Sequence, residues 1–266
     1  MKLSIITVNL NNLEGLKKTY ESVVCQTFTD YEWLVIDGGS TDGSREFIEE
    51  HQDKFSYWCS EPDKGIYNAM NKGIVRAKGE YLNFMNSGDC FACEDTLEKV
   101  FLKEINEDII YGCMAIGHIN GPLFANATKE KIEWYDLFPN TLPHQASFIR
   151  KKLFDKVGLY DETLKVVSDS RWFAMAILNY GATYKFLPIK IAIFAEGGIS
   201  RITDFSLERT GQKKNIFPDY MTEEDTMNLM ILSIIHSFRW SSFLFKVLKI
   251  IALQVYSYQR RKSVSF

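Results

Sequence analysis

The segment Gly79-Glu80-Tyr81-Leu82-Asn83-Phe84-Met85-Asn86-Ser87-Gly88-Asp89 decides the fold, because a run of strand-forming residues ends abruptly in small and acidic ones. A second segment has the same layout: Trp33-Leu34-Val35-Ile36 is followed by Asp37-Gly38-Gly39-Ser40-Thr41-Asp42-Gly43-Ser44. In an open α/β sheet, ligands bind in the crevice outside the carboxyl ends of the strands. Two strands that end in Gly and Asp therefore predict one site for a polar, phosphorylated ligand with a metal ion.

Strand and helix patterns alternate around these two segments. Strand signals recur at Leu3–Val8, Trp33–Ile36, Tyr57–Cys59 and Tyr81–Met85. Helical spacing of apolar residues separates them, at Leu13–Cys25, Ser44–His51 and Gly65–Ala77. This alternation with short connections is typical of βαβ units and predicts a parallel sheet.

After Asp89 the alternation becomes less regular. We expect a strand over 109–114, a loop-rich region as far as Pro143, and helices over 153–157 and 171–178. From about Asp204 onward the sequence is helical in pattern and has a charge character of its own.

The composition is that of an ordinary soluble globule. The chain has 266 residues, of which 46% are hydrophobic and 24% charged, so a large core needs no disulfide to stabilise it. Five cysteines form no disulfide framework, which fits a reducing compartment, and the Cys90/Cys93 pair lacks the partner pair of a zinc site. The apolar run at the N-terminus is too short for a signal peptide and reads as a buried first strand.

Charge is distributed unevenly along the chain. The last acidic residue is Asp225, and residues 226–266 carry a charge of +6, which leaves −9 for the rest. Within the tail, Lys246 and Lys249 lie on one face of an apolar helical segment, Phe243–Leu253. Such a segment suits either the interface of an anionic membrane or packing on the protein's own body. The acidic body disfavours nucleic acid as a partner.

Several acidic residues could perform chemistry, and each also has a structural interpretation. Asp89 could bind a divalent cation, or it could close a turn. Asp37 and Asp42 flank a glycine-rich turn that could hold an anion, although Ser40 or Asp42 could instead cap the following helix. Asp169 could act as a general base or as a helix N-cap.

His144 is a further candidate. It follows Pro143 and precedes Gln145, and it could bind substrate or diphosphate or serve as a hydrogen-bonded structural residue.

The order of these motifs resembles that of the family 2 glycosyltransferases with the GT-A fold, in particular bacterial members that build capsule, O-antigen or other exopolysaccharides. The resemblance covers nearly all of residues 3–91 and is weaker at 143–145, 158–162, 168–169 and 197–200. The segments that carry it are Ser4–Asn9, Ser22–Phe28, Glu32–Gly43, Glu61–Gly73 and Gly79–Asp89.

The resemblance implies an α/β GT-A domain that transfers a sugar from a nucleotide-sugar donor, UDP-linked by family habit, with inversion. Asp169 would deprotonate the acceptor hydroxyl, and Asp89 would hold Mg²⁺ or Mn²⁺ on the diphosphate. The donor-binding residues implied are Thr7, Asn9, Asp37, Asp63, Lys64, Asn86 and Ser87. The loop residues implied to bind the acceptor or diphosphate are His144, Gln145, Gly197, Gly198 and Ser200.

We also expect an organisation and a location, of which the C-terminal part rests on the change of charge after Asp225 and not on the resemblance. Residues 1–205 would form the GT-A domain, with its nucleotide-sugar half at about 1–115 and its acceptor half at 116–205. Residues 206–266 would form a helical, basic C-terminal extension. We expect a cytoplasmic protein that meets the inner face of a membrane through residues 226–266 and acts on a glycan or lipid-linked acceptor.

Two positions depart from the family pattern. Gly88 stands where the family has a metal-binding Asp, so Asn86 is an alternative source of a ligand oxygen. Gly38 stands where many members have an Asp that reads the base. Both departures motivate a second hypothesis, a non-catalytic sugar-nucleotide-binding subunit of a synthase complex. A nucleotidyltransferase is disfavoured because Asn9-Leu10-Asn11-Asn12 lacks a glycine-rich basic loop.

Overall fold

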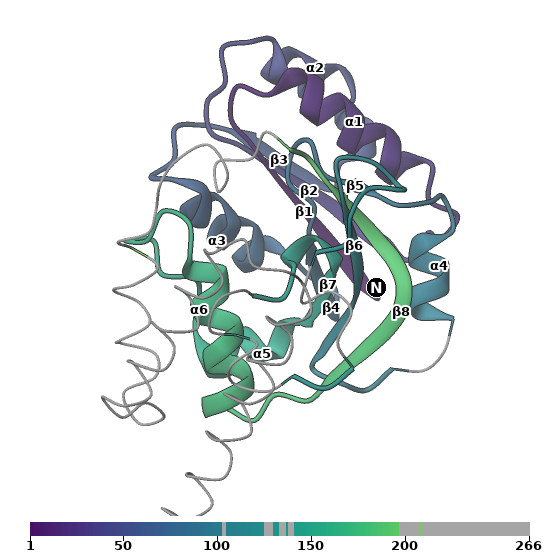
Figure 1. Ribbon diagram of the computed structural model, residues 1–266. Coiled ribbons are helices and arrows are strands. Elements are labelled where there is room, and N and C mark those ends of the chain that lie inside the picture. Colours follow the sequence, from purple (N-terminus) through teal and green to yellow (C-terminus); the bar gives the residue numbers. More distant parts are fainter. Residues whose placement is uncertain (103–104, 125–129, 133–136, 138–140, 197–207, 209–266) are drawn as a thin grey trace, which may run out of the picture. The chain divides into compact units, whose positions relative to one another are not determined.

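The computed structural model describes residues 1–102, 105–124, 130–132, 137, 141–196 and 208, which form a mixed α/β fold around one sheet (Figure 1). The strands are β1 (Leu3–Asn9), β2 (Tyr31–Asp37), β3 (Tyr57–Ser60), β4 (Tyr81–Phe84), β5 (Cys90–Phe91), β6 (Ile109–Ile116), β7 (Ser147–Arg150) and β8 (Tyr184–Phe194). The helices are α1 (Leu13–Val24), α2 (Ser44–Glu50), α3 (Ile66–Arg76), α4 (Thr96–Phe101), α5 (Lys151–Val157) and α6 (Ser168–Ala174). Short 3-10 turns lie at Gln52–Lys54 and His144–Ala146, and a π-helical turn at Met175–Asn179 continues α6.

The sheet has the strand order β3-β2-β1-β4-β7-β6-β8-β5. The strands β3, β2, β1 and β4 run parallel, which confirms the parallel βαβ units predicted for the first 90 residues. Beyond β4 the sheet is mixed, because β7 and β5 run antiparallel to their neighbours. Parallel pairing brings the carboxyl ends of β1, β2 and β4 to one edge.

Helices cover both faces of the sheet. The helices α1 and α2 lie on one face, and α3, α5 and α6 lie on the other (Figure 1). The strand β1 is buried on both faces, and Leu3, Ile5 and Ile6 are fully enclosed. Full burial of such a side chain contributes about 1.5–3 kcal/mol. Gly73 lets α3 approach β1 closely, because a Cβ there would lie 2.5 Å from Cγ2 of Ile6.

The predictions for the second half of the chain were less complete. The helix expected over 171–178 begins earlier, at Ser168, and changes to π-helical geometry at Met175. The strands β5, β7 and β8 and the helix α4 were not predicted. The long strand β8 is mostly half-buried and contains a proline, so it shows neither strict alternation nor a continuous apolar run.

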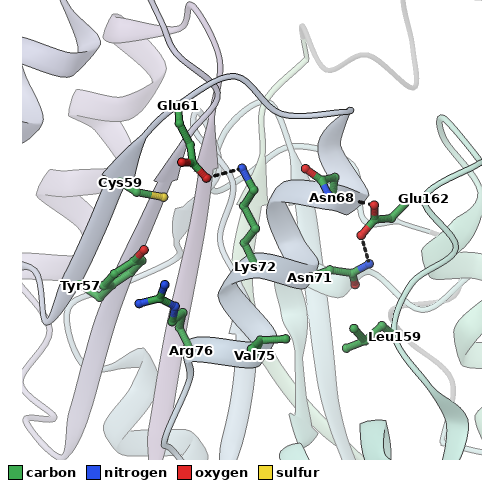
Figure 2. A pocket seen from close by; sticks show the side chains of 10 residues that line it. All are labelled: Tyr57, Cys59, Glu61, Asn68, Asn71, Lys72, Val75, Arg76, Leu159 and Glu162. Atoms are coloured by element: carbon green, nitrogen blue, oxygen red, sulfur yellow. Dashed lines mark hydrogen bonds and ion pairs between the residues drawn. The ribbon is translucent and has the colours of Figure 1, made fainter.

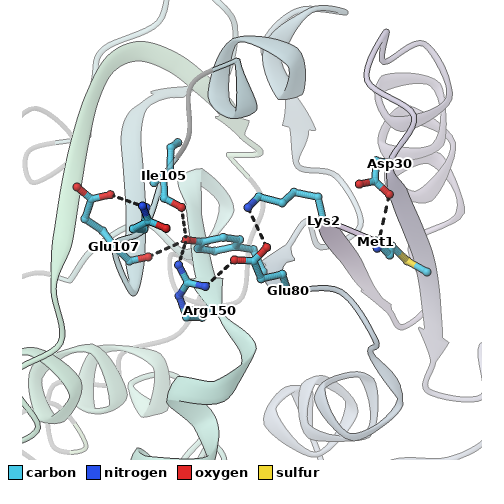
Figure 3. Close-up of polar contacts among 9 residues, drawn as sticks. Met1, Lys2, Asp30, Glu80, Ile105, Glu107 and Arg150 are labelled. Carbon is cyan, nitrogen blue, oxygen red and sulfur yellow. Dashed lines mark hydrogen bonds and ion pairs between the residues drawn. The ribbon is translucent and has the colours of Figure 1, made fainter.

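A cluster of charged residues joins strands at the amino-terminal edge of the sheet (Figure 3). Arg150 on β7 binds Glu80 at 2.5 Å and donates to the Tyr81 hydroxyl at 2.6 Å, while Lys2 binds Glu80 at 2.8 Å. Burial raises the pKa of Tyr81 to about 12, so its hydroxyl stays neutral. This cluster lies at the edge opposite the carboxyl ends of the parallel strands, so we assign it a structural role.

All five cysteines are free. Burial raises the pKa of Cys90 to about 11, which disfavours the thiolate that redox chemistry needs. A redox role for Cys90 is therefore disfavoured.

By compactness the chain divides into residues 1–213 and 214–266. The predicted helical extension over 206–266, apart from Glu208, lies outside the described residues. Among the residues that are described, no helix is long and apolar enough to span a bilayer.

Candidate active site

Polar side chains from β1, β2 and β4 meet at the carboxyl edge of the sheet. Parallel register places Asn9 beside Asp37, and the Asn9 amide donates to Asp37 Oδ1 at 2.7 Å. Ser87, in the turn after β4, donates to Asn9 Oδ1 at 2.7 Å. Three residues that the sequence proposed for donor binding are therefore joined in one hydrogen-bond network.

Asp37 is the centre of this network and is fully buried. Besides Asn9, it accepts hydrogen bonds from the hydroxyls of Ser40 and Ser60, both at 2.6 Å, and from the backbone amides of Gly39 and Ser40. Burial acts to raise the pKa of Asp37, but these donors together hold it below its ordinary value. Asp37 thus shapes the turn after β2 instead of presenting a free carboxylate to a nucleoside.

Thr7 does not reach this edge. Its side chain is 0% exposed, and its hydroxyl accepts a hydrogen bond from the Trp33 indole at 2.9 Å. The structure gives Thr7 a packing role in the core, and its place in the donor pocket stays a prediction.

Asp63 lies against Gly38. A Cβ at position 38 would stand 2.7 Å from Asp63 Oδ2, so the absence of a side chain there makes room for this carboxylate. The other oxygen, Oδ1, accepts a hydrogen bond from the Gly65 amide at 2.8 Å. The neighbouring Lys64 is exposed. A carboxylate is therefore present beside position 38, although the sequence has lost the one that many family members carry there.

Asp169 lies at the centre of a second network, on the first turn of α6. Its Oδ2 is 3.1 Å from His144 Nδ1, and its Oδ1 accepts from the Tyr67 hydroxyl at 3.0 Å and from the Ser170 amide at 2.8 Å. His144 Nε2 is 3.2 Å from the amide nitrogen of Asn86, which can only donate. Nε2 is thus the acceptor, and Nδ1 carries the proton that binds Asp169. The structure brings Asn86, His144 and Asp169 together as a continuous chain.

Asp89 is held by hydrogen bonds inside the fold. It is 4% exposed, its Oδ2 accepts from the Gln145 amide at 3.0 Å, and its Oδ1 accepts from the backbone amide of Ala195 at 3.0 Å. Burial raises its pKa to about 6. Asp89 therefore ties the turn after β4 to the 3-10 turn at Gln145 and to the end of β8. Its assignment as the metal ligand stays a prediction, for which Asn86 is the alternative.

Asn86 offers a better fit to a divalent cation. Its Oδ1 is buried and has no hydrogen-bond partner among the described residues, and an amide oxygen is a suitable ligand for Mg²⁺ or Mn²⁺. Within the described part of the chain, no group of three or more His, Cys, Asp or Glu side chains could hold a metal ion by itself. A cation at Asn86 would therefore take most of its ligands from the phosphates of the donor and from water.

Gly88 has a conformational reason to be glycine. Its φ is +102°, which L-residues rarely adopt, and a Cβ would lie 3.2 Å from Cβ of Ala195. A family carboxylate at this position would need a different turn. The glycine at position 88 and the inward direction of the Asp89 side chain are therefore features of the same turn.

Sequence reasoning missed two residues that contact this site. Tyr67 was quoted only as part of a matching segment, because a tyrosine on the buried face of a helix carries no functional signal of its own. Glu208 accepts hydrogen bonds through Oε1 from the amides of Lys165, Val166 and Val167, at 2.8–3.1 Å, and so holds the loop before α6. The predicted loop residues Gly197, Gly198 and Ser200 lie outside the described residues.

A groove of about 310 Å³ lies elsewhere, beside α3 (Figure 2). Its polar side chains bind one another: Lys72 pairs with Glu61 at 2.8 Å, and Glu162 accepts from the amides of Asn68 and Asn71. It contains none of the residues predicted for the site. We therefore place the candidate active site at the carboxyl edge of the sheet and not in this groove.

Comparison with known proteins shows the family to which this chain belongs. Residues 4–159 match the model of the family described as "Glycosyl transferase family 2", and this chain belongs to that family. It is 32% identical over 185 residues to an uncharacterized glycosyltransferase of Mycobacterium tuberculosis, covering 66% of this chain and 69% of that one. It is 28% identical over 204 residues to a PGL/p-HBAD biosynthesis glycosyltransferase of Mycobacterium bovis, covering 74% and 78%.

Solved structures share the fold. S. aureus TarS 1-349 in complex with UDP superimposes with a TM-score of 0.67 at 19% identity, covering 91% of this chain and 73% of that one. The mannosyltransferase PcManGT from Pyrobaculum calidifontis, in complex with GDP-Man and Mn²⁺, has a TM-score of 0.60 at 15% identity, covering 99% and 83%. These likenesses confirm the predicted GT-A fold. The family match shows that the chain is a glycosyltransferase.

Proposed function

We propose that this enzyme is an inverting glycosyltransferase that moves a sugar from a UDP-linked donor to a glycan or lipid-linked acceptor in surface polysaccharide biosynthesis. The observation that carries the proposal is the chain Asn86–His144–Asp169 at the carboxyl edge of the sheet. It places a carboxylate, fixed by hydrogen bonds, next to the turn where the donor diphosphate would lie.

The reaction follows from the roles of these residues. Asp169 takes the proton of the acceptor hydroxyl while the acceptor oxygen forms a bond to the anomeric carbon. The bond from that carbon to the diphosphate breaks, and its electron pair leaves with the nucleoside diphosphate. A divalent cation held by Asn86 would neutralise charge on the departing diphosphate. Asn9, Ser87, Asp63 and Lys64 would surround the nucleoside and phosphates. Asp37 holds Asn9 in place, and Asn9 in turn accepts from Ser87.

Donor binding can be tested by a thermal-shift panel of UDP-, GDP-, dTDP- and CMP-sugars, each with and without Mn²⁺. A donor at 100 times its dissociation constant adds about 2.7 kcal/mol of stability, which corresponds to a rise in Tm of about 5–10 °C. We expect this rise for one nucleotide, UDP. The additional rise in Tm that Mn²⁺ causes should vanish in Asn86→Ala and persist in Asp89→Asn. No rise for any donor would contradict the proposal.

A second candidate function is a non-catalytic sugar-nucleotide-binding subunit, which the missing carboxylates at Gly38 and Gly88 favour. Such a subunit would show the thermal shift but would release no nucleoside diphosphate when an acceptor is present. Release by the wild-type protein would exclude it.

We further propose that the enzyme is cytoplasmic and meets the inner face of the membrane through residues 226–266, because that tail is basic and partly apolar. Deletion of residues 226–266 should reduce binding to vesicles that contain anionic lipid. Equal binding by the full and shortened chains would contradict this contact.

A further inference from the structure

Tyr67 approaches Asp169 from a different layer of the fold. It is the second residue of α3, 102 positions before Asp169, and its hydroxyl donates to Asp169 Oδ1 at 3.0 Å. The side chain is 4% exposed, and its ring packs against that of Tyr160 with centroids 5.6 Å apart. The hydroxyl therefore has one fixed direction, toward the carboxylate.

The two oxygens of Asp169 are used unequally. Oδ1 accepts from Tyr67 and from the Ser170 amide at 2.8 Å, which fills both of its lone pairs. Among the residues that the structure describes, Oδ2 accepts only from His144, at 3.1 Å, which leaves it one lone pair. An acceptor hydroxyl can thus be deprotonated only at Oδ2, provided that Tyr67 stays on Oδ1.

Tyr67 is suited to remain a donor throughout the reaction. Burial, the charge of Asp169 and the hydrogen bond to it all raise the pKa of Tyr67 well above its ordinary value. Its hydroxyl therefore does not ionise at neutral pH and does not compete for the proton of the acceptor.

We propose that Tyr67 is a positioning residue for the catalytic base: by occupying Oδ1 of Asp169 it leaves Oδ2 as the atom that receives the proton of the acceptor. This inference rests on the proposed function of Asp169. Tyr67 touches neither donor nor acceptor in this role, so its loss should lower the rate of the chemical step without weakening donor binding.

The test compares Tyr67→Phe with Tyr160→Phe. Both tyrosines are buried near Asp169, but the Tyr160 hydroxyl has no hydrogen-bond partner in the described part of the chain. The second variant therefore removes an equivalent group without touching the base. The assay follows nucleoside diphosphate released from a UDP-sugar with water as the acceptor. We expect kcat to fall about tenfold to thirtyfold in Tyr67→Phe and to stay near wild type in Tyr160→Phe.

Three further readouts separate positioning from folding. In Tyr67→Phe, the donor KM, the donor Kd by calorimetry and the Tm should match those of Tyr160→Phe. In a protein that already carries Asp169→Asn, Tyr67→Phe should not lower kcat further, because the carboxylate that Tyr67 positions is already lost. Wild-type turnover with equal kcat in the two Phe variants would overturn this inference alone. Absence of turnover in the wild type would overturn the proposed function and this inference with it.

Discussion

Asp169→Asn should lower sugar transfer about 1,000-fold, while donor binding stays within about twofold of wild type. General bases contribute typically 10²–10⁴ in rate, and an amide cannot accept the proton of the acceptor hydroxyl. The substitution is nearly isosteric. Its remaining oxygen can still accept from Tyr67 and Ser170, so the turn before α6 should keep its structure.

The measurement is nucleoside diphosphate release, together with calorimetric titration of the donor. Asp155→Asn is a suitable control, because Asp155 is exposed on α5 and the substitution removes the same charge. Asp169→Asn with turnover equal to that of the control would remove Asp169 as the base. Loss of donor binding together with turnover would mean that Asp169 holds the donor instead.

Asp37→Ala should lower the free energy of unfolding by about 3–5 kcal/mol, because it leaves several buried donors without an acceptor. The carboxylate is fully buried and accepts from Asn9, Ser40 and Ser60 as well as from backbone amides. Domains are stable by only about 5–15 kcal/mol, so this single change removes a large part of the total. Urea unfolding followed by circular dichroism measures it.

Asp42→Ala is the matched control in the same turn. Asp42 is exposed and, among the described residues, accepts from the Leu13 and Ser44 amides, so its loss should cost about 1 kcal/mol, as for a helix cap. If the two substitutions lowered the free energy of unfolding equally, the role given to Asp37 would be contradicted.

The stability that Asp37 contributes should depend on pH. Its pKa is lower in the folded protein than in the unfolded chain, where it is about 3.9. The contribution is thus fully present above pH 4 and is lost as the pH falls through the folded pKa. The stability difference between wild type and Asp37→Asn should therefore shrink in acid, and a constant difference down to pH 2 would contradict this account.

The first half of the fold could be predicted from the sequence because its elements are local and regular. Each parallel strand from β1 to β4 is a short apolar run, and each is separated from the next by helical spacing. In β8 the side chains are mostly half-buried, and the strand pairs with β6 across two register shifts, so its pattern depends on partners far away in sequence. Local patterns carry no such information.

The sequence predicts which strand ends form the candidate site, but it does not predict which side chains contact one another there. The positions of Asn9, Asp37 and Asn86 follow from the carboxyl edge of a parallel sheet. The direction of the Asp89 side chain does not follow from the sheet, because its partners Gln145 and Ala195 are 56 and 106 residues away in the sequence. The contact of Tyr67 with Asp169 likewise depends on how α3 packs beside α6, which no local spacing encodes.

The central claim is that the donor binds at the carboxyl edge of the sheet, across the ends of β1, β2 and β4. Crystals grown with UDP and Mn²⁺ test it most directly. The account predicts nucleotide density there, with the diphosphate beside Asn86 and the nucleoside near Asp63 and Gly38. Nucleotide bound in the groove between Lys72 and Glu162, with the carboxyl edge left without ligand, would contradict it.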